Sequence, residues 1–237
     1  MKNIFLLLFS ILFFYNSFGQ IKFGINTSIL FCNGETVQPS VYGVSRTPTQ
    51  KNLSAGIKIG LGIKYPISKS LILMPELNLV NKGNKSTVKF SSPNYFQTIV
   101  TKYSLTFIEL PLNIAYKGKK SESFIIGGGP VFSMGIGGTL KTTDGFTGLS
   151  AGIKNIKQSI TFDGNASTVI SDKEDFHLNK FEVGWNIFIS QMVSKKVNLK
   201  LSYFRSTTNL QPDDNYKLKI NYVSVGCGFL LKGKDGK

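Results

Sequence analysis

Apolar and polar side chains alternate along residues 53–65, and this alternation predicts a long β-strand. Every second side chain from Leu53 to Tyr65 is apolar, whereas the residues between them are Ser, Gly or Lys. A period of two gives a strand one apolar face and one polar face. The 13 residues span about 43 Å, which a tilt of about 45° reduces to the ~30 Å of a bilayer's hydrocarbon core. We therefore expect a transmembrane strand with lipid on one face and a polar lumen on the other.

Seven further segments carry strand-like patterns of comparable length. They are Ile21–Phe31, Leu71–Val80, Lys102–Tyr116, Phe124–Ile136, Lys180–Ser190, Val197–Arg205 and Tyr216–Leu230. Eight strands in total is an even number, as bacterial outer-membrane barrels have. The predicted fold class is all-β: an eight-stranded antiparallel up-and-down transmembrane β-barrel that forms one domain over residues 21–231.

The connections between these segments alternate in length. Long stretches (32–52, 81–101, 137–179 and 206–215) take turns with short ones (66–70, 117–123 and 194–196). A membrane barrel with long outer loops and short periplasmic turns requires this alternation, whereas a sandwich or a lipocalin does not. We therefore expect both chain ends on the periplasmic side.

The N-terminal 20 residues have the organisation of a secretory signal peptide. A short basic start with Lys2 precedes an apolar core from Ile4 to Tyr15, and the small polar exit ends near Gly19. The core is too short for a spanning helix. We expect cleavage near residue 20, export of the chain, and insertion of the mature barrel in the outer membrane. Residues 232–237 form a short basic tail.

The formal net charge of +15 raises the question of an anionic partner. Nucleic acid is the usual partner of so basic a chain, but here the lysines are dispersed over turns, strand ends and lumen positions. We expect outer-membrane lipid and the phosphates of lipopolysaccharide as partners, with other envelope proteins as further candidates, and no nucleic acid. A generic basic surface is the alternative.

Charged residues recur on the polar faces of the predicted strands. The candidate lumen network comprises Lys22, Lys58, Glu76, Glu109, Glu182 and Lys200. Side chains fill the interior of an eight-stranded barrel, and an unpaired buried charge is costly. We therefore expect a plug of ion pairs and hydrogen bonds, with Lys58 bound to Glu76 or Glu109 and Lys22 at the periplasmic end. A proton or ion pathway is the alternative.

Candidate catalytic and metal-binding chemistry is sparse. His177, the only histidine, follows Asp172, Glu174 and Asp175 in the long third loop, with Ser171 nearby. One histidine cannot form a His-rich metal cage, and we interpret it as a solvated loop residue, with half a metal site or part of a hydrolase as alternatives. We expect no catalytic residue, no bound metal and no cofactor.

Two further features could indicate a phosphate-binding loop and a disulfide, but we interpret both as structural. Gly127-Gly128-Gly129-Pro130 resembles a phosphate-binding loop, but no helix pattern follows it. We expect glycines that face a narrow lumen or bend the strand. Cys32 and Cys227 are predicted at opposite ends of neighbouring strands, beyond the roughly 7 Å that a disulfide tolerates, so we expect both to be free.

Two short motifs carry a family resemblance. Phe107-Ile108-Glu109-Leu110-Pro111-Leu112 and the segment Leu73–Gly83, with its Pro75-Glu76-Leu77, resemble signatures of the PorT-like outer-membrane β-barrel family of Bacteroidota. The Gly-Gly-Pro strand and the strand from Phe181 also fall where that family has such segments. The resemblance implies an eight-stranded outer-membrane barrel without an implied activity; the founding member of the family is linked to type IX secretion. Val183-Gly184 lacks the aspartate that many members carry there.

Three classes of function are consistent with these patterns. The leading prediction is a non-enzymatic outer-membrane barrel with a side-chain-filled lumen, whose loops serve structural or interaction roles, with an association with secretion as an extension of it. The second is a soluble, periplasmic, lipocalin-like binder of small ligands. The third is an outer-membrane enzyme, lipid-modifying or proteolytic, that uses His177.

Overall fold

The computed structural model describes residues 21–37, 50–92, 95–118, 123–147, 152–165, 176–212 and 217–231. The predicted signal peptide (1–20) and the basic tail (232–237) lie outside these residues. The described residues form 11 strands: β1 (Lys22–Val37), β2 (Gln50–Asn52), β3 (Ser54–Pro66), β4 (Leu71–Ser92), β5 (Tyr95–Lys117), β6 (Phe124–Thr147), β7 (Gly152–Phe162), β8 (Phe176–Leu178), β9 (Phe181–Met192), β10 (Val197–Ser206) and β11 (Lys217–Leu230). They include no helix that is long and apolar enough to cross a membrane.

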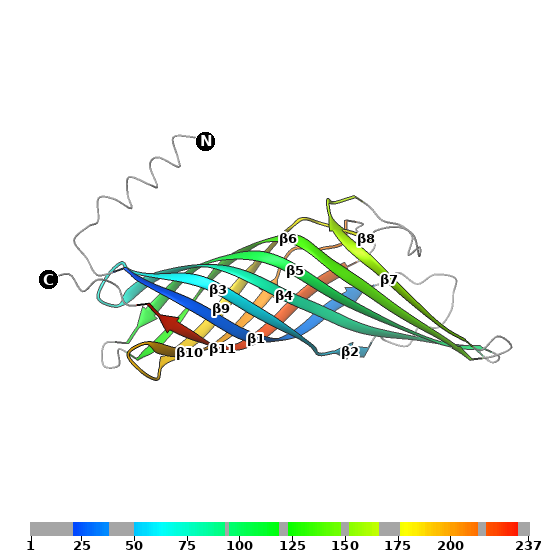
Figure 1. Cartoon of the computed structure of the whole chain (residues 1–237), viewed down its shortest axis with the longest axis horizontal. Helices are drawn as coiled ribbons and strands as arrows, with labels where there is room; N and C mark the ends of the chain where they lie inside the picture. Colours follow the sequence, from blue (N-terminus) through cyan, green and yellow to red (C-terminus); the bar gives the residue numbers. More distant parts are fainter. Residues whose placement is uncertain are drawn as a thin grey trace.

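Eight of these strands close into a barrel (Figure 1). Each is antiparallel to its neighbours in the order β1, β3, β4, β5, β6, β9, β10, β11, and β11 pairs back onto β1. Closure leaves no free strand edge in the ring, as the absence of water in a bilayer demands. The eight-stranded antiparallel barrel predicted from the alternation is confirmed.

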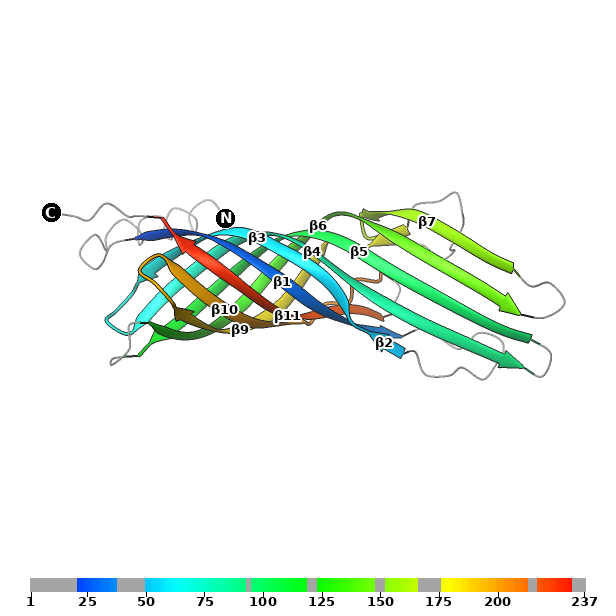
Figure 2. The ribbon, with the colours of Figure 1, turned by 60° about the horizontal axis from the view of Figure 1, so that its bottom comes forward.

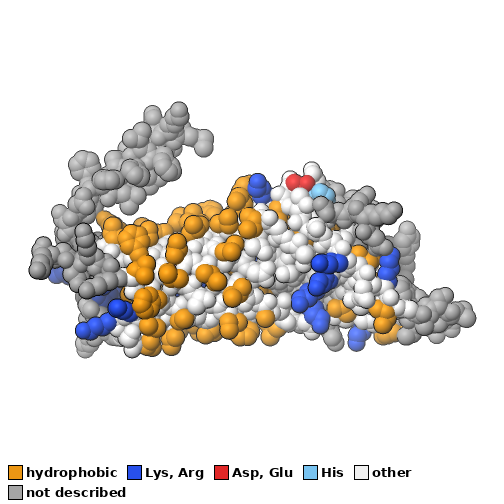
Figure 3. Space-filling view, in the orientation of Figure 1, with side chains coloured by type: hydrophobic (Ala, Val, Ile, Leu, Met, Phe, Trp, Pro, Cys, Tyr) orange, Lys and Arg blue, Asp and Glu red, His pale blue; other side chains and the backbone are white. Residues whose placement is uncertain are grey.

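The outer face of the barrel is apolar over a broad band (Figure 3). Side chains at every second position point outward from each wall, among them Leu61 and Ile187, which are 60% and 63% exposed. Their neighbours in the sequence point inward and are buried, as the pattern of β9 shows from Phe181 to Gln191. This sorting of faces matches lipid outside and a polar lumen inside.

The short connections all lie at one end of the barrel. The turn at residues 67–70 joins β3 to β4, and the turn at 193–196 joins β9 to β10. β1 begins and β11 ends at the same end, because Lys22 pairs with Lys64 and the N–H of Leu230 donates to the carbonyl of Lys196. The predicted grouping of the short turns and of both ends of the barrel at one end is therefore confirmed, while the assignment of that end to the periplasm stays a prediction.

Two of the predicted outer loops are wrong, because strands occupy most of them. β4 continues to Ser92 and β5 begins at Tyr95, so residues 81–101 are largely a hairpin. β6 continues to Thr147 and pairs with β7 across residues predicted as loop. In these extensions one face stays buried, as at Tyr103 and Leu140, but the opposite face carries exposed polar side chains such as Lys85. The contrast between apolar and polar positions that marks a lipid-facing strand is therefore lost, although the backbone pairing persists.

These extensions form an outer sheet that stands beyond the barrel (Figure 2). We define the outer sheet as residues 81–92 of β4, 95–106 of β5, 137–147 of β6, and β7. β2 and β8 extend it at its edges by pairing with β4 and β7. A register shift between Thr106 and Phe107 of β5 marks where the outer sheet leaves the ring; such bulges bend a strand.

Candidate functional site

The interior of the barrel carries a buried cluster of charged side chains, which is the candidate site. Lys82 on β4 lies between two carboxylates, with Nζ 2.9 Å from Oε1 of Glu109 on β5 and 2.5 Å from Oε2 of Glu182 on β9. Tyr222 on β11 donates a hydrogen bond of 2.7 Å to Oε2 of Glu109. Residues from four strands of the ring therefore meet around one ammonium group, which is fully buried.

Aromatic rings enclose the same ammonium group. Nζ of Lys82 lies 4.4 Å from the ring centre of Phe107 and 4.5 Å from that of Phe204. Phe204 in turn stacks on Tyr222, with ring centres 4.8 Å apart. A cation over an aromatic face is attracted by the ring quadrupole, and more strongly when water is excluded. The rings therefore both shield the cluster from water and stabilise its cation.

A second ion pair lies nearer the periplasmic end. Lys200 on β10 bonds to Glu76 on β4, and both side chains are at least nine-tenths buried. The ring of Phe188 lies 4.5 Å from Nζ of Lys200. Asn186 donates to Oδ1 of Asn113 at 3.2 Å and adds a polar contact across the lumen.

The predicted partner of Lys58 is wrong. The lysine within ion-pair distance of Glu76 is Lys200, and that of Glu109 is Lys82. Lys58 is buried, and its Nζ lies 5.6 Å from the ring centre of Tyr222. The sequence pattern missed Lys82 because residues 81–101 were assigned to a loop, whereas β4 carries Lys82 into the lumen on the same face as Glu76 and Val80.

The buried charges balance. Among the described residues, the buried Lys, Arg, Asp and Glu side chains are three lysines and three glutamates: Lys58, Lys82, Lys200, Glu76, Glu109 and Glu182. An unbalanced charge in a dry interior is far more costly than a set that sums to zero. The equal numbers of buried lysines and glutamates indicate a structural plug, in which Lys82 binds two of the glutamates and Lys200 binds the third.

Apolar layers cover this charged layer on both sides. Towards the outer sheet lies a cluster that includes Leu30, Leu105, Leu218 and Ile220. Towards the periplasm lies a smaller one: Ile72, Met74, Ala115, Ile125 and Phe188. The lumen is therefore filled at three levels: the apolar cluster towards the outer sheet, the charged cluster, and the smaller apolar cluster.

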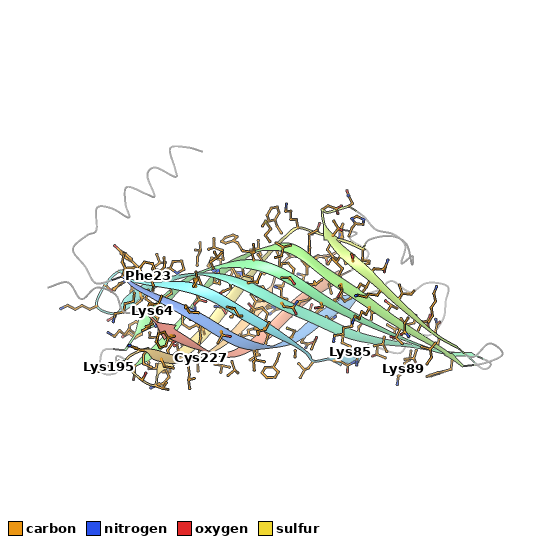
Figure 4. All side chains as sticks on the ribbon, viewed as in Figure 1. Phe23, Lys64, Lys85, Lys89, Lys195 and Cys227 are labelled. Carbon is orange, nitrogen blue, oxygen red and sulfur yellow. The ribbon has the colours of Figure 1, made fainter. Side chains whose placement is uncertain are left out.

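Lys22 lies apart from this network, at the periplasmic mouth where it was expected. A cavity of about 770 Å³ opens there, lined by six lysines: Lys22, Lys64, Lys69, Lys117, Lys195 and Lys196. Figure 4 labels Lys64 and Lys195 at this end of the barrel. Lys22 is exposed and therefore contributes to a basic rim rather than to the buried plug.

The glycine run of β6 serves packing. A Cβ at Gly127 would lie 2.8 Å from the ring of Phe188 and 2.7 Å from the carbonyl oxygen of Ile114. Ordinary Cβ contacts are longer than this, so the inward ring of Phe188 occupies the space that a side chain would need. This agrees with the interpretation of lumen-facing glycines in a narrow barrel and not with a phosphate-binding loop.

His177 lies on β8 at the edge of the outer sheet and pairs with a residue that the sequence pattern did not single out. Its Nδ1 lies 2.9 Å from both carboxylate oxygens of Asp163. The backbone N–H of Asn165 donates to Asp163 and, together with His177 and the Asn165 side chain, holds the pKa of that carboxyl below its usual range. Residues 171–175, which contain the other acidic candidates and Ser171, lie outside the described residues.

Two further expectations concern metals and disulfides. The part of the chain that is described holds no group of three His, Cys, Asp or Glu side chains placed to bind a metal ion. Cys32 is buried and Cys227 is exposed on the outer face, and both are free, as predicted. In the register of β1 with β11, Cys32 faces Tyr222 whereas Cys227 faces Thr27, which separates the two thiols along the strands.

The match to a protein family agrees with this architecture. The profile of a family described as outer membrane protein beta-barrel domain matches residues 14–212, a span that contains every strand from β1 to β10. No curated protein matches the sequence. Among solved structures, Ail, the attachment invasion locus protein of Yersinia pestis, is 9% identical, covers 90% of this chain and 100% of its own, and has a TM-score of 0.42. OprG from Pseudomonas aeruginosa is 11% identical, covers 90% and 96%, and has a TM-score of 0.37. Neisserial surface protein A is 10% identical, covers 87% and 96%, and has a TM-score of 0.37.

Proposed function

The chain belongs to the outer membrane protein beta-barrel domain family and resides in the outer membrane, and from this premise we propose that it is a closed, non-enzymatic barrel that works through the sheet it presents at the cell surface. The narrower resemblance to PorT-like barrels, with its link to secretion, stays a prediction.

The filled lumen is the observation that carries this proposal. Lys82, Glu109 and Glu182 are each 0% exposed, and apolar clusters lie on both sides of them. An aqueous pore needs a continuous polar path, and the interior of an eight-stranded barrel is just wide enough for side chains to fill. The lumen is therefore built as a core and not as a channel.

We propose that the barrel is not an enzyme because the carboxylates in its lumen are bound to lysines. The carboxylates inside the lumen are held by buried lysines, as in the pairs of Lys82 with Glu109 and of Lys200 with Glu76. A general acid or base must reach a substrate proton, and these groups are enclosed by protein. They hold the barrel together and do not face a substrate.

The lipocalin-like alternative is not favoured by the distribution of apolar surface. A soluble binder of that kind keeps its apolar surface around an internal ligand cavity and its polar residues outside. Here Leu61 and Ile187 belong to an exposed apolar band, and the interior is packed with its own side chains. The surface suits contact with lipid.

Planar-bilayer recording tests the closed lumen. We expect no steady conductance from the purified full chain. The variant Phe107→Ala/Phe204→Ala removes the two rings around Lys82, and its opening events show that the recording detects a breached plug. Heat-modifiable migration on a gel verifies that both proteins are folded. A large steady conductance of the unmutated protein overturns the closed-barrel proposal.

Surface labelling tests the presentation of the outer sheet. In a Cys227→Ser background, Ile153→Cys places a thiol on β7, where Ile153 is 76% exposed. A membrane-impermeant maleimide should label it on intact cells. The matched control Lys195→Cys lies in a periplasmic turn and should be labelled only after the outer membrane is permeabilised. The reverse pattern overturns the proposed orientation.

A further inference from the structure

Four lysines stand directly opposite one another across the outer sheet. Lys85 of β4 pairs with Lys102 of β5, Lys102 with Lys141 of β6, and Lys141 with Lys157 of β7. Facing residues share one side of a sheet, and all four side chains are exposed. With neighbouring strands about 4.8 Å apart, this lysine row is about 14 Å long.

The lysine row lacks internal compensation. Like charges that face each other across strands destabilise a sheet, and here the repulsion is repeated three times in succession. None of the four ammonium groups lies within 4.0 Å of a carboxylate among the described residues. An arrangement that raises the free energy of the sheet by itself fits a surface that an external anion neutralises.

The height of the lysine row above the membrane narrows the choice of anion. The outward apolar band ends at Leu79 on β4 and Ile108 on β5, and the row lies six residues further along each strand. Six residues at about 3.3 Å, tilted by about 45°, rise about 14 Å. The headgroup region adds only about 5–8 Å to each side of a bilayer's hydrocarbon core. An anion at this height needs a taller headgroup than a phospholipid has.

A polar depression lies between the apolar band and the lysine row. It has a volume of about 430 Å³, and its lining includes Asn81, Ser104, Thr106, Gly137 and Thr139. The amide of Asn81 donates to the hydroxyls of Thr106 at 3.2 Å and Ser104 at 3.4 Å, so its floor is uncharged and rich in hydrogen-bonding groups. Such a floor suits the hydroxyl groups of a sugar.

On one face of the molecule, the apolar band is thus followed outward by the sugar-sized polar depression and then by the lysine row. Figure 3 shows lysines beyond the end of the apolar band, and Figure 4 labels Lys85 and Lys89 on this side. We propose that this face binds lipopolysaccharide of the outer leaflet: acyl chains on the band, a headgroup sugar in the depression, and headgroup phosphates on Lys85, Lys102, Lys141 and Lys157. The inference rests on the proposed function only in placing the outer sheet at the cell surface.

The experiment compares two variants with the same change in charge. In the row variant, Lys85, Lys102, Lys141 and Lys157 are all replaced by Gln. In the control variant, the same replacement is made at Lys22, Lys69, Lys195 and Lys196, which are exposed at the periplasmic end. The full chain is placed in nanodiscs of neutral lipid, and binding is measured with rough lipopolysaccharide, with dephosphorylated rough lipopolysaccharide, and with inorganic phosphate.

We expect the row variant to bind rough lipopolysaccharide on the order of 10- to 1,000-fold more weakly, and the control variant to change binding less than about threefold. Dephosphorylation should weaken binding to the unmutated protein by a similar factor, and added salt should weaken it further. Removing four like charges relieves repulsion, so the row variant should fold. Folding is checked by heat-modifiable migration.

Four results overturn the inference, and the first three concern the row itself. These are equal losses in the two variants, unchanged binding by the row variant, or saturation of the row by inorganic phosphate at the same concentration as lipopolysaccharide. A fourth arm uses nanodiscs that contain phosphatidylglycerol: competition by that lipid as strong as by lipopolysaccharide assigns the row to phospholipid and overturns the choice of ligand. Conductance and surface labelling do not depend on these outcomes, so failure here is distinct from failure of the closed, surface-presenting barrel.

Discussion

The ammonium of Lys82 lies 2.5 Å from Oε2 of Glu182, although the two residues are 100 positions apart in the sequence and belong to different walls of the barrel. Glu109 binds the same ammonium from a third wall. A buried ion pair is weak evidence for stability by itself, because desolvation opposes the attraction. Removing one partner is different, since it leaves uncompensated charge in a dry interior.

Lys82→Met should therefore lower the free energy of unfolding by about 3–5 kcal/mol. The change leaves Glu109 and Glu182 without their shared cation, and urea titration of the barrel in lipid vesicles measures the loss. Lys85→Met is the matched control. It lies three residues away on the exposed face of the same strand, and we expect a change within about 0.5 kcal/mol.

A triple variant distinguishes the effect of the buried charges from the effect of side-chain shape. Lys82→Met/Glu109→Gln/Glu182→Gln removes all three charges together, and most of the lost stability should return. If the triple variant is as unstable as Lys82→Met, shape and not charge explains the effect.

Tyr222→Phe should lower the free energy of unfolding by about 1.5–3 kcal/mol, because a hydrogen bond to a charged group is lost. The hydroxyl of Tyr222 lies 2.7 Å from Glu109, while its ring keeps the stack on Phe204 in the variant. Tyr203→Phe is the control, since Tyr203 faces outward and is 40% exposed. Equal effects of the two changes would show that the hydroxyl inside the barrel has no special role.

Gly127→Ala tests how tightly the lumen is filled. The added Cβ would meet the ring of Phe188 at 2.8 Å, and overpacking of this kind lowers the free energy of unfolding by about 1–3 kcal/mol. The same change at Gly137, also on β6, has no atom within 4 Å of the new Cβ and should be close to neutral. Urea titration distinguishes the two; a stable Gly127→Ala variant would indicate a looser lumen.

The sequence pattern predicts the ring of eight strands because lipid makes each outward position apolar. It places Glu76, Glu109, Glu182 and Lys200 in the interior for the same reason. The pattern fails beyond Val80, where water replaces lipid on the outer face and Lys85 follows the same alternation as Leu79 without its hydrophobicity. The sequence pattern therefore did not place Lys82 in the lumen. It also did not predict the ion pairs of Glu109 and Glu182, because these depend on the register of strands that are far apart in the sequence.

The single tryptophan provides a spectroscopic test of which side chains face lipid. Trp185 points outward from β9 and is 59% exposed, whereas Phe188, three residues on, is 3% exposed inside the lumen. In vesicles, brominated acyl chains should quench Trp185 strongly and aqueous acrylamide should quench it weakly, because lipid and not water covers that face. In Trp185→Phe/Phe188→Trp the fluorophore lies inside the filled barrel, and neither quencher should reach it. Strong acrylamide quenching of Trp185 would contradict the lipid-facing assignment, and strong acrylamide quenching of the Phe188→Trp fluorophore would contradict the filled lumen.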